Sequence, residues 1–211
     1  MSILEEIASF MQKGRARTVK ELVKKAVDEG ISAQQILDDA LLASMAIVGE
    51  KFKNNEVFVP EVLVCARAMN TGVEVLKPYL LSEGVVAKGV AIIGTVKGDL
   101  HDIGKNIVKL MLESKGIEVV DLGVDVPAET FVAKAIEHNA KIICCSALLT
   151  TTMYEMRNVV EQTQKAGIRD KVKIMVGGAP ITQEFCDSIG ADYYTSDGAS
   201  CADVASVVCG E

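Results

Sequence analysis

The chain has 211 residues, of which 49% are hydrophobic and 24% are charged, a balance typical of one or two folded domains. Its formal net charge is −7, so it has no excess of basic residues for phosphates, and neither nucleic acid nor a membrane surface is expected as a partner. The opening residues lack the pattern of a secretory signal, and no later run approaches the ~20 apolar residues that span a bilayer. A cytoplasmic location is therefore expected.

Six cysteines are scattered along the chain without a CxxC pair. Cys144 and Cys145 are adjacent within an apolar, strand-like run. This arrangement favours buried, reduced thiols, and neither a zinc site nor an iron–sulfur cluster is expected.

Residues 1–84 are expected to form a helical domain. Ser2 and Glu5 have the spacing of a capping box at the start of a first helix. A second apolar stripe closes at Gly30, and Ser32 begins a third segment with apolar residues at helical spacing.

A fourth helix is predicted to open at Pro60 and to end before Pro78. It presents an apolar stripe formed by Val62, Leu63, Ala66, Met69, Val73 and Leu76. Four amphipathic helices joined by short loops predict a small antiparallel four-helix bundle, followed by a linker near residues 82–84.

Residues 85–211 show a different pattern, in which short apolar runs alternate with helix-like segments. The runs are residues 89–96, 116–123, 141–148, 172–178 and 191–196. Strands that are apolar on both faces and linked by helices predict an α/β domain with a Rossmann-like (flavodoxin-like), doubly wound, five-stranded parallel sheet. A ligand is expected beyond the carboxyl ends of its strands.

The loop after the first predicted strand contains His101, one of only two histidines. Asp99 could accept a hydrogen bond from one ring nitrogen and leave the other free to bind a metal. A helix beginning near Gly104 would favour the neutral ring, whereas Asp99 and Asp102 oppose that effect. A cap or turn partner is the ordinary alternative role for such a histidine.

No second histidine or cysteine lies near His101 in the sequence, so a tetrahedral zinc site has little support, and one histidine better suits a metal held by a macrocycle. The other histidine, His138, falls near the end of a predicted helix, where it is expected to interact with terminal carbonyl groups.

Two further loops follow predicted strands. The loop at residues 146–152 carries hydroxyl side chains that could line a slot or cap a helix. Gly177 and Gly178 would permit close approach of a ligand, or form an ordinary turn.

Taken together, these motifs resemble the B12-binding fingerprint of methionine synthase and of corrinoid proteins from methylotrophic methyltransferase systems, DxHxxG followed by SxL and GG. Here 41 residues lie between Gly104 and Ser146, and 28 lie between Leu148 and Gly177. Both gaps match the family pattern.

The resemblance implies a cobalamin or related corrinoid cofactor. His101 would replace the cofactor's dimethylbenzimidazole as the lower axial cobalt ligand. Asp99 and Thr152 would complete a proton relay with His101, and methionine synthase carries serine at the position of Thr152. The other implied contacts are Leu100, Asp102, Ile103 and Gly104 in the histidine loop, and Ser146, Leu148, Thr150, Gly94, Gly177 and Gly178 along the nucleotide tail.

The helical half resembles the family's cap over the upper corrin face. Phe52, Val59 and Val62 would contact that face, and ordinary bundle core is the alternative role for them. An apolar lid of this kind would shield the cofactor from water and move aside for partner enzymes.

The resemblance covers about residues 1–208, so no substrate domain is expected. It implies a carrier rather than an enzyme in itself, with three partners: a substrate-specific methyltransferase, a second methyltransferase acting on tetrahydrofolate or coenzyme M, and a reductive activating protein. Cobalt would supply the chemistry. Alternative functions are the B12-binding subunit of a mutase, a B12-dependent sensor or regulator, and a generic flavodoxin-like binding module.

Overall fold

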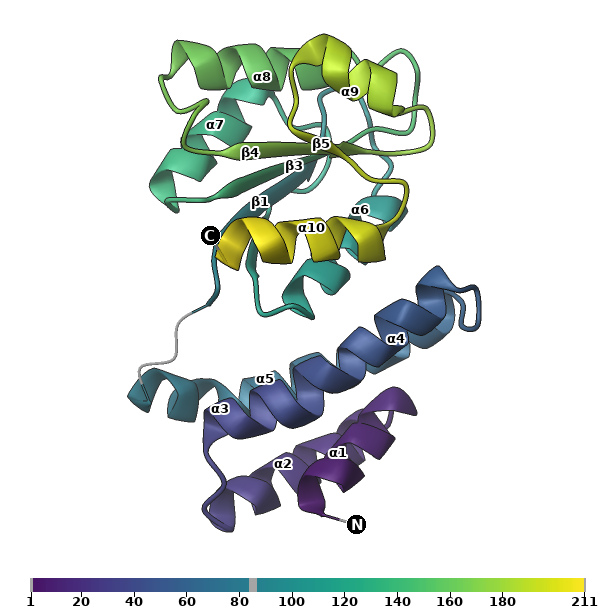
Figure 1. Ribbon diagram of the computed structural model, residues 1–211, viewed down its shortest axis with the longest axis vertical. Helices are drawn as coiled ribbons and strands as arrows, with labels where there is room; N and C mark the ends of the chain where they lie inside the picture. Colours follow the sequence, from purple (N-terminus) through teal and green to yellow (C-terminus); the bar gives the residue numbers. More distant parts are fainter. Residues whose placement is uncertain (1, 84–86, 211) are drawn as a thin grey trace. The chain divides into compact units, whose positions relative to one another are not determined.

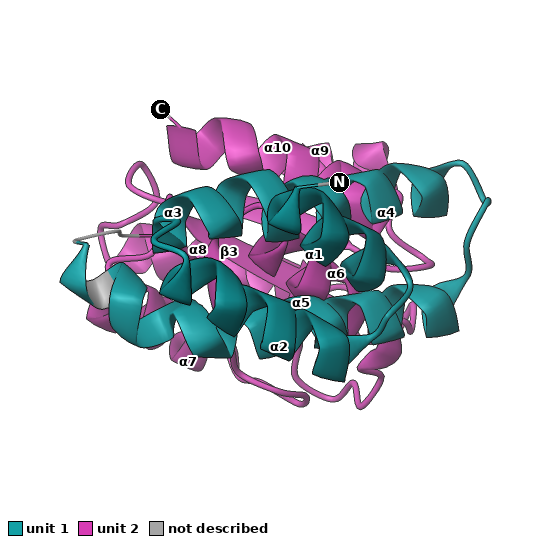
Figure 2. Cartoon of the chain, turned by 90° about the horizontal axis from the view of Figure 1, so that it is seen from below, with its two compact units in different colours: residues 1–86 teal, residues 87–211 magenta. Residues whose placement is uncertain are grey.

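The computed structural model describes residues 2–83 and 87–210. It divides into two compact units, residues 1–86 and 87–211 (Figure 2). The domain boundary expected between residues 84 and 85 falls within residues 84–86, which lie outside the described residues.

The N-terminal unit is helical, as predicted. Its elements are α1 (Ile3–Gln12), α2 (Ala16–Asp28), α3 (Ala33–Gln35), the π-helical segment η1 (Ile36–Leu42), α4 (Ala43–Lys53) and α5 (Val59–Ser82). Because α3, η1 and α4 follow one another without a gap, they make one long helical rod (Figure 1). The π-helical stretch within this rod was not predicted.

The predicted caps of this unit are present. Ser2 and Glu5 form the capping box of α1, and the Ser32 hydroxyl accepts a hydrogen bond from the Gln35 amide at the start of α3. The buried face of the unit is lined by residues from α1, α2, the long rod and α5, including Ile7, Met11, Val19, Val23, Ile36, Leu41, Met45, Met69 and Leu76.

Two predictions about the fourth helix were wrong. Pro78 lies inside α5, which continues to Ser82, because a proline near a helix end removes only one backbone hydrogen bond. The extra turn brings the Glu83 carboxylate to the amides of Ala33 and Gln34, at 2.9 and 3.2 Å, so that it caps α3. Leu63, assigned to the apolar stripe, is 44% exposed.

The C-terminal unit contains the predicted five-stranded parallel sheet. Its strands are β1 (Val90–Thr95), β2 (Glu118–Asp121), β3 (Ile142–Ser146), β4 (Lys173–Gly177) and β5 (Tyr193–Tyr194), in the spatial order β2-β1-β3-β4-β5. This is the flavodoxin-like order, whose topological switch point lies between β1 and β3. The register pairs Thr95 with Ser146 and Ser146 with Gly177, so three predicted loops begin side by side.

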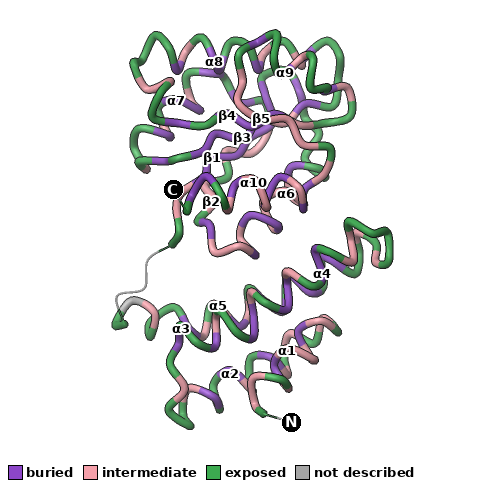
Figure 3. The backbone as a smooth tube through the Cα atoms, in the orientation of Figure 1, coloured by how far each residue is buried: buried purple, intermediate pink, exposed green. Residues whose placement is uncertain are grey.

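Helices cover both faces of the sheet. In Figure 1, α6 (Ile103–Glu113) and α10 (Gly198–Gly210) lie on one face, and α7 (Ala128–Glu137), α8 (Glu155–Lys165) and α9 (Gln183–Ile189) lie on the other. The central strands β1, β3 and β4 are buried on both faces (Figure 3), which explains why their sequences are apolar without alternation.

All six cysteines are buried and free. On β3, Cys145 joins the core beneath α7 and α8, whereas the Cys144 thiol is hydrogen-bonded to Cys201 of α10. Burial raises the pKa of the Cys145 thiol to about 12, so this thiol stays protonated. No helix within residues 2–83 and 87–210 has the length and apolar character needed to cross a membrane.

Candidate functional site

The candidate site lies at the carboxyl edge of the sheet, where the loops after β1 and β3 meet. Asp99, from the first loop, is completely buried and reaches across to the second. Its Oδ2 accepts hydrogen bonds from the amides of Leu148 and Leu149, at 2.8 and 3.2 Å, and from the Thr152 hydroxyl at 2.7 Å. One carboxylate oxygen therefore joins two loops that are 49 residues apart at Leu148.

The other Asp99 oxygen serves His101. Oδ1 accepts a hydrogen bond from the His101 amide at 3.1 Å and lies 2.7 Å from the ring Nδ1. Nδ1 is therefore the protonated nitrogen of the neutral ring, and the lone pair is left on Nε2. The His101 side chain is 50% exposed. The hydrogen bond predicted between Asp99 and one ring nitrogen is therefore present, and the other ring nitrogen is left without its proton, as a metal ligand requires.

Burial alone would raise the pKa of the Asp99 carboxyl. Hydrogen bonds from His101, Leu148 and Thr152 outweigh burial and hold the pKa of Asp99 well below its usual value. Asp99 is therefore a fixed negative charge that orients the imidazole through Nδ1.

Thr152 lies where a relay residue was predicted. Besides its bond to Asp99, its hydroxyl is 3.1 Å from the Leu149 carbonyl oxygen. A threonine hydroxyl has only one proton to donate, so these two acceptors share it.

A third loop, which follows β2, supports the histidine loop from the other side. The Asp125 carboxylate accepts a hydrogen bond from the Gly98 amide at 2.7 Å, and the Asp125 amide donates to the Asp99 carbonyl oxygen at 2.9 Å. Asp125 has a φ of 54° and Gly98 a φ of 80°, so both lie in the left-handed region that glycine and aspartate tolerate best. Sequence reasoning missed Asp125, because nothing in its immediate neighbours indicates the contact.

Lys105 was also missed. It is 2% exposed, and its ammonium lies 2.7 Å from Asp121 at the end of β2 and 2.8 Å from the Asn106 side chain. Burial alone would raise the pKa of the Asp121 carboxyl, but the hydrogen bonds from Lys105 and the Gly123 amide and the charges of Lys105 and Lys109 together outweigh burial and lower it. This buried ion pair fixes the first turn of α6 against the sheet.

Exposed apolar side chains occur in the histidine loop and in the loop that Asp99 joins to it. Leu100 and Ile103 are 71% and 73% exposed, and Leu148 is 44% exposed. Helix α6 begins at Ile103, close to the predicted start, with Asp102 at its N-cap. Such exposed aliphatic side chains beside one imidazole suit a flat, largely apolar ligand.

The predicted glycines fall into two groups. At Gly178, with φ 133°, a side chain would collide with the Ala147 carbonyl oxygen, so the backbone itself requires glycine. At Gly94 a side chain would come 2.8 Å from the Phe131 ring, which gives Gly94 a packing role within the protein. A side chain added at Gly104 would point into open space, clear of the rest of the described protein beyond its own helix, and one added at Gly177 would lie at an ordinary 3.5 Å from the Thr195 carbonyl oxygen.

The remaining predicted residues are placed as follows. Ser146 is partly buried at the end of β3, and Thr150 is exposed in the following loop. Phe52 and Val59 are partly buried at the ends of α4 and α5, and Val62 is completely buried. These three residues belong to the N-terminal unit, and their contact with a ligand stays a prediction.

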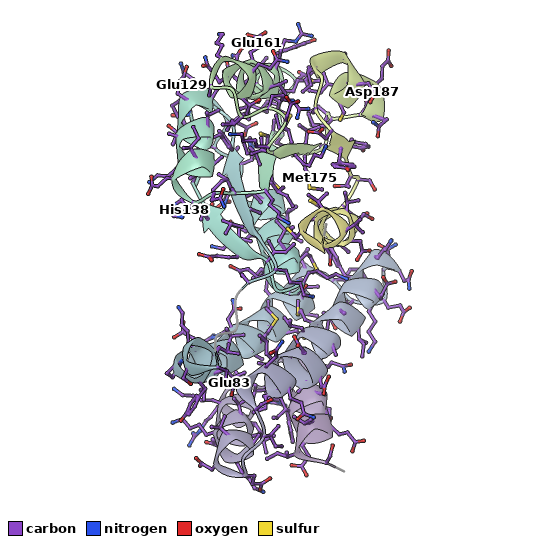
Figure 4. The ribbon with its side chains drawn as sticks, turned by 60° about the vertical axis from the view of Figure 1, so that its left-hand side comes forward. Glu83, Glu129, His138, Glu161, Met175 and Asp187 are labelled. Atoms are coloured by element: carbon purple, nitrogen blue, oxygen red, sulfur yellow. The ribbon has the colours of Figure 1, made fainter. Side chains whose placement is uncertain are left out.

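His138 is the C-cap residue of α7 (Figure 4), where its backbone amide donates to the carbonyl oxygens of Lys134 and Ile136. Its ring Nε2 lies 3.5 Å from the Glu137 carboxylate, and an interaction of the ring with terminal carbonyl groups stays a prediction. Among the described residues, no three His, Cys, Asp or Glu side chains are grouped as metal ligands.

Comparison with known proteins places this geometry in a family. Models described as B12 binding domains match residues 89–202 and 3–77. Trimethylamine corrinoid protein 1 of Methanosarcina acetivorans is 48% identical over 190 residues, covering 89% of this chain and 87% of that protein. The chain belongs to the family of B12-binding corrinoid proteins.

Two further relatives of this corrinoid protein agree. Dimethylamine corrinoid protein of Methanosarcina barkeri is 45% identical, with 92% of each chain covered. The crystal structure of the methanol:cobalamin methyltransferase complex from the same organism contains a chain that superposes with a TM-score of 0.89 at 32% identity, covering 98% of this chain and 79% of that chain. The predicted family and fold are therefore confirmed.

The residues present fit a corrinoid. A metal held by a macrocycle could take one further nitrogen from the protein, and His101 would offer Nε2, since its other ring nitrogen is held by Asp99. Exposed aliphatic side chains occur at Leu100 and Ile103 of the same loop and at Leu148, and the space beside Gly104 is not filled by the described protein.

Proposed function

We propose that this corrinoid protein carries a methyl group from a substrate-specific methyltransferase to a second methyltransferase. When bound, the cofactor supplies the cobalt on which the methyl group is carried. The observation that carries the proposal is the half-exposed imidazole of His101, whose Nδ1 is held by the buried carboxylate of Asp99. Asp99 also accepts hydrogen bonds from the His101, Leu148 and Leu149 amides and from the Thr152 hydroxyl.

The residues would divide the work as follows. Nε2 of His101 would ligate cobalt on the lower face, Asp99 would hold the ring and its proton on Nδ1, and Thr152 would fix Asp99. Leu100, Ile103 and Leu148 would exclude water from the corrin edge, while Ser146, Thr150, Gly177 and Gly178 would receive the nucleotide tail. Phe52, Val59 and Val62 would cover the upper face as a movable lid.

The donor is proposed to be a methylated amine. The relatives described above are named as trimethylamine and dimethylamine corrinoid proteins at 48% and 45% identity, whereas the methanol complex is matched at 32%. The same names favour a methyl carrier over a mutase subunit or a B12-dependent regulator. The acceptor of the methyl group would be tetrahydrofolate or coenzyme M. A reductive activating protein would reduce the cofactor again after accidental oxidation, and the whole system would work in the cytoplasm.

Isotope transfer tests this function. The reduced, corrinoid-loaded protein is incubated with a trimethylamine- or dimethylamine-specific methyltransferase and substrate labelled in its methyl groups, with a methanol-specific methyltransferase and labelled methanol in parallel. We expect the protein to take up label from the methylated amine and to take up much less label from methanol. Label from methanol alone would reject the amine donor, and label from neither, with the corrinoid retained, would reject the carrier.

A further inference from the structure

The backbone of His101 is held at both of its polar groups. Its amide donates to Asp99 Oδ1, and its carbonyl oxygen accepts a hydrogen bond of 2.8 Å from the Thr95 hydroxyl. Asp99 belongs to the same loop as His101, whereas Thr95 is the last residue of β1. Of these two partners, only Thr95 ties the histidine directly to a strand of the sheet.

Thr95 is itself fixed on every side. It is completely buried, its amide donates to the Gly123 carbonyl oxygen, and its own carbonyl accepts from the Val126 amide, both at 3.0 Å. Strand β1 is paired with β2 on one side and β3 on the other. The hydroxyl therefore projects from a rigid part of the molecule, and its position does not depend on the loop it holds.

The hydroxyl has no evident use other than this bond. Valine has nearly the same shape as threonine and suits a buried strand at least as well. A buried hydroxyl is unfavourable unless it is hydrogen-bonded, and the partner that the structure gives Thr95 Oγ1 is the His101 carbonyl oxygen.

We propose that Thr95 is a positioning residue for His101: its hydroxyl closes the loop of residues 96–101 and holds the imidazole where Nε2 can reach cobalt. The two ends of the histidine then have separate anchors. Asp99 holds the ring and the amide of His101, and Thr95 anchors the His101 carbonyl oxygen to the sheet. The proposal rests on the assignment of His101 as the axial ligand.

The test compares Thr95→Val, which removes the hydroxyl at nearly constant shape, with Thr95→Ser, which keeps it. Thr163→Val is the matched control, because Thr163 is also completely buried and its hydroxyl donates to a backbone carbonyl, that of Val160 at 2.6 Å within α8. The first readout is amide hydrogen exchange of His101 in the cofactor-free protein. Loss of one hydrogen bond should speed this exchange about fivefold in Thr95→Val, with Thr95→Ser and Thr163→Val unchanged.

The second readout is the dissociation constant for hydroxocobalamin, measured for Thr95→Val in the natural sequence and in the His101→Ala background. If Thr95 acts through the histidine, binding weakens about fivefold in the natural sequence and does not change in the His101→Ala background. An equal loss in both backgrounds, or no change in His101 exchange, would overturn the proposal. Failure of the unmodified protein to bind hydroxocobalamin would instead reject the proposed function, while the exchange experiment would still decide the role of Thr95.

Discussion

Asp99 is the residue on which the site depends. Its two oxygens accept from the amides of His101, Leu148 and Leu149, from the Thr152 hydroxyl and from the His101 ring. A carboxylate is the only side chain of this size that accepts on all sides, because an amide would present two donors to neighbours that are donors themselves.

Asp99→Asn should therefore lower the free energy of unfolding at pH 7 by about 3 kcal/mol, since it removes charged hydrogen bonds and leaves buried donors unpaired. Urea denaturation measures the loss. Thr152→Val removes only one of the donors and should cost about 1 kcal/mol. An Asp99→Asn protein as stable as the natural one would contradict the structural role of the carboxylate.

The same variant tests the pKa of Asp99. Because its pKa is lower in the folded than in the unfolded protein, the ionised carboxylate stabilises the fold fully above the unfolded-state pKa of about 4, and this stabilisation is lost as the pH falls toward the folded-state pKa. The stability gap between the natural protein and Asp99→Asn should narrow on acidification from pH 7 to pH 3. A gap that stays constant over this range would show that the carboxyl pKa is not shifted.

Glycines 178 and 104 were predicted from the same fingerprint, but the structure gives them different physical roles. Gly178→Ala should destabilise the protein by about 2 kcal/mol or more, because the residue has a positive φ and its side chain would meet Ala147. Gly104→Ala should leave stability unchanged or raise it by up to about 1 kcal/mol, because the position is helical and open.

If the open space beside Gly104 receives the corrin, Gly104→Ala should nevertheless weaken corrinoid binding. Thermal unfolding of the cofactor-free variants and retention of hydroxocobalamin after desalting separate the two effects. Unweakened binding by Gly104→Ala would remove Gly104 from the set of cofactor contacts.

At the scale of the elements, three loops from β1, β2 and β3 hold one another. Asp125 links the loop after β2 to the histidine loop, and substitutions there should lower stability by graded amounts. Asp125→Asn keeps a hydrogen-bond acceptor and tolerates a positive φ, Asp125→Gly tolerates only the positive φ, and Asp125→Ala does neither. We expect losses in unfolding free energy of about 0.5, 1 and 2 kcal/mol in that order. An alanine variant no less stable than the glycine variant would show that backbone strain at Asp125 is unimportant.

The sequence predicted elements where local rules and burial agree. The apolar strands, the Ser2 capping box and the start of α6 followed from patterning alone. Continuation of α5 through Pro78 did not, because a proline in the sequence is an ordinary signal for the end of a helix and the Glu83 cap on α3 that follows this turn joins residues far apart in the sequence. The π-helical turn at residues 36–42 likewise has the same apolar spacing as an ordinary helix.

The site could be predicted only in part for the same reason. The spacing of Asp99 and His101 is local, so their contact could be expected. Thr95, Lys105 and Asp125 reach their partners through the folded chain, and their residue types are common in loops and helix starts. Thr152 was found through family resemblance rather than through any local pattern.

For the whole molecule, the two units differ in how their sequence encodes them. The helical unit buries one face of each amphipathic helix, whereas the sheet unit buries its central strands on both faces (Figure 3). In the sheet unit, Glu129, Glu161 and Asp187 lie on the outer sides of α7, α8 and α9 (Figure 4). The hydrogen-bonded side chains of the candidate site, those of Asp99, His101 and Thr152, all belong to the sheet unit, residues 87–211.

The central claim is that this chain holds a corrinoid through His101. The most direct measurement is the visible absorption spectrum of the purified protein after incubation with hydroxocobalamin and desalting, with His101→Ala in parallel and His138→Ala as the matched histidine control. We expect corrin bands with an axial-ligand shift in the natural protein and in His138→Ala, and loss of that shift in His101→Ala. Retention of the same shifted spectrum by His101→Ala, or no corrinoid retained by the natural protein, would contradict the account.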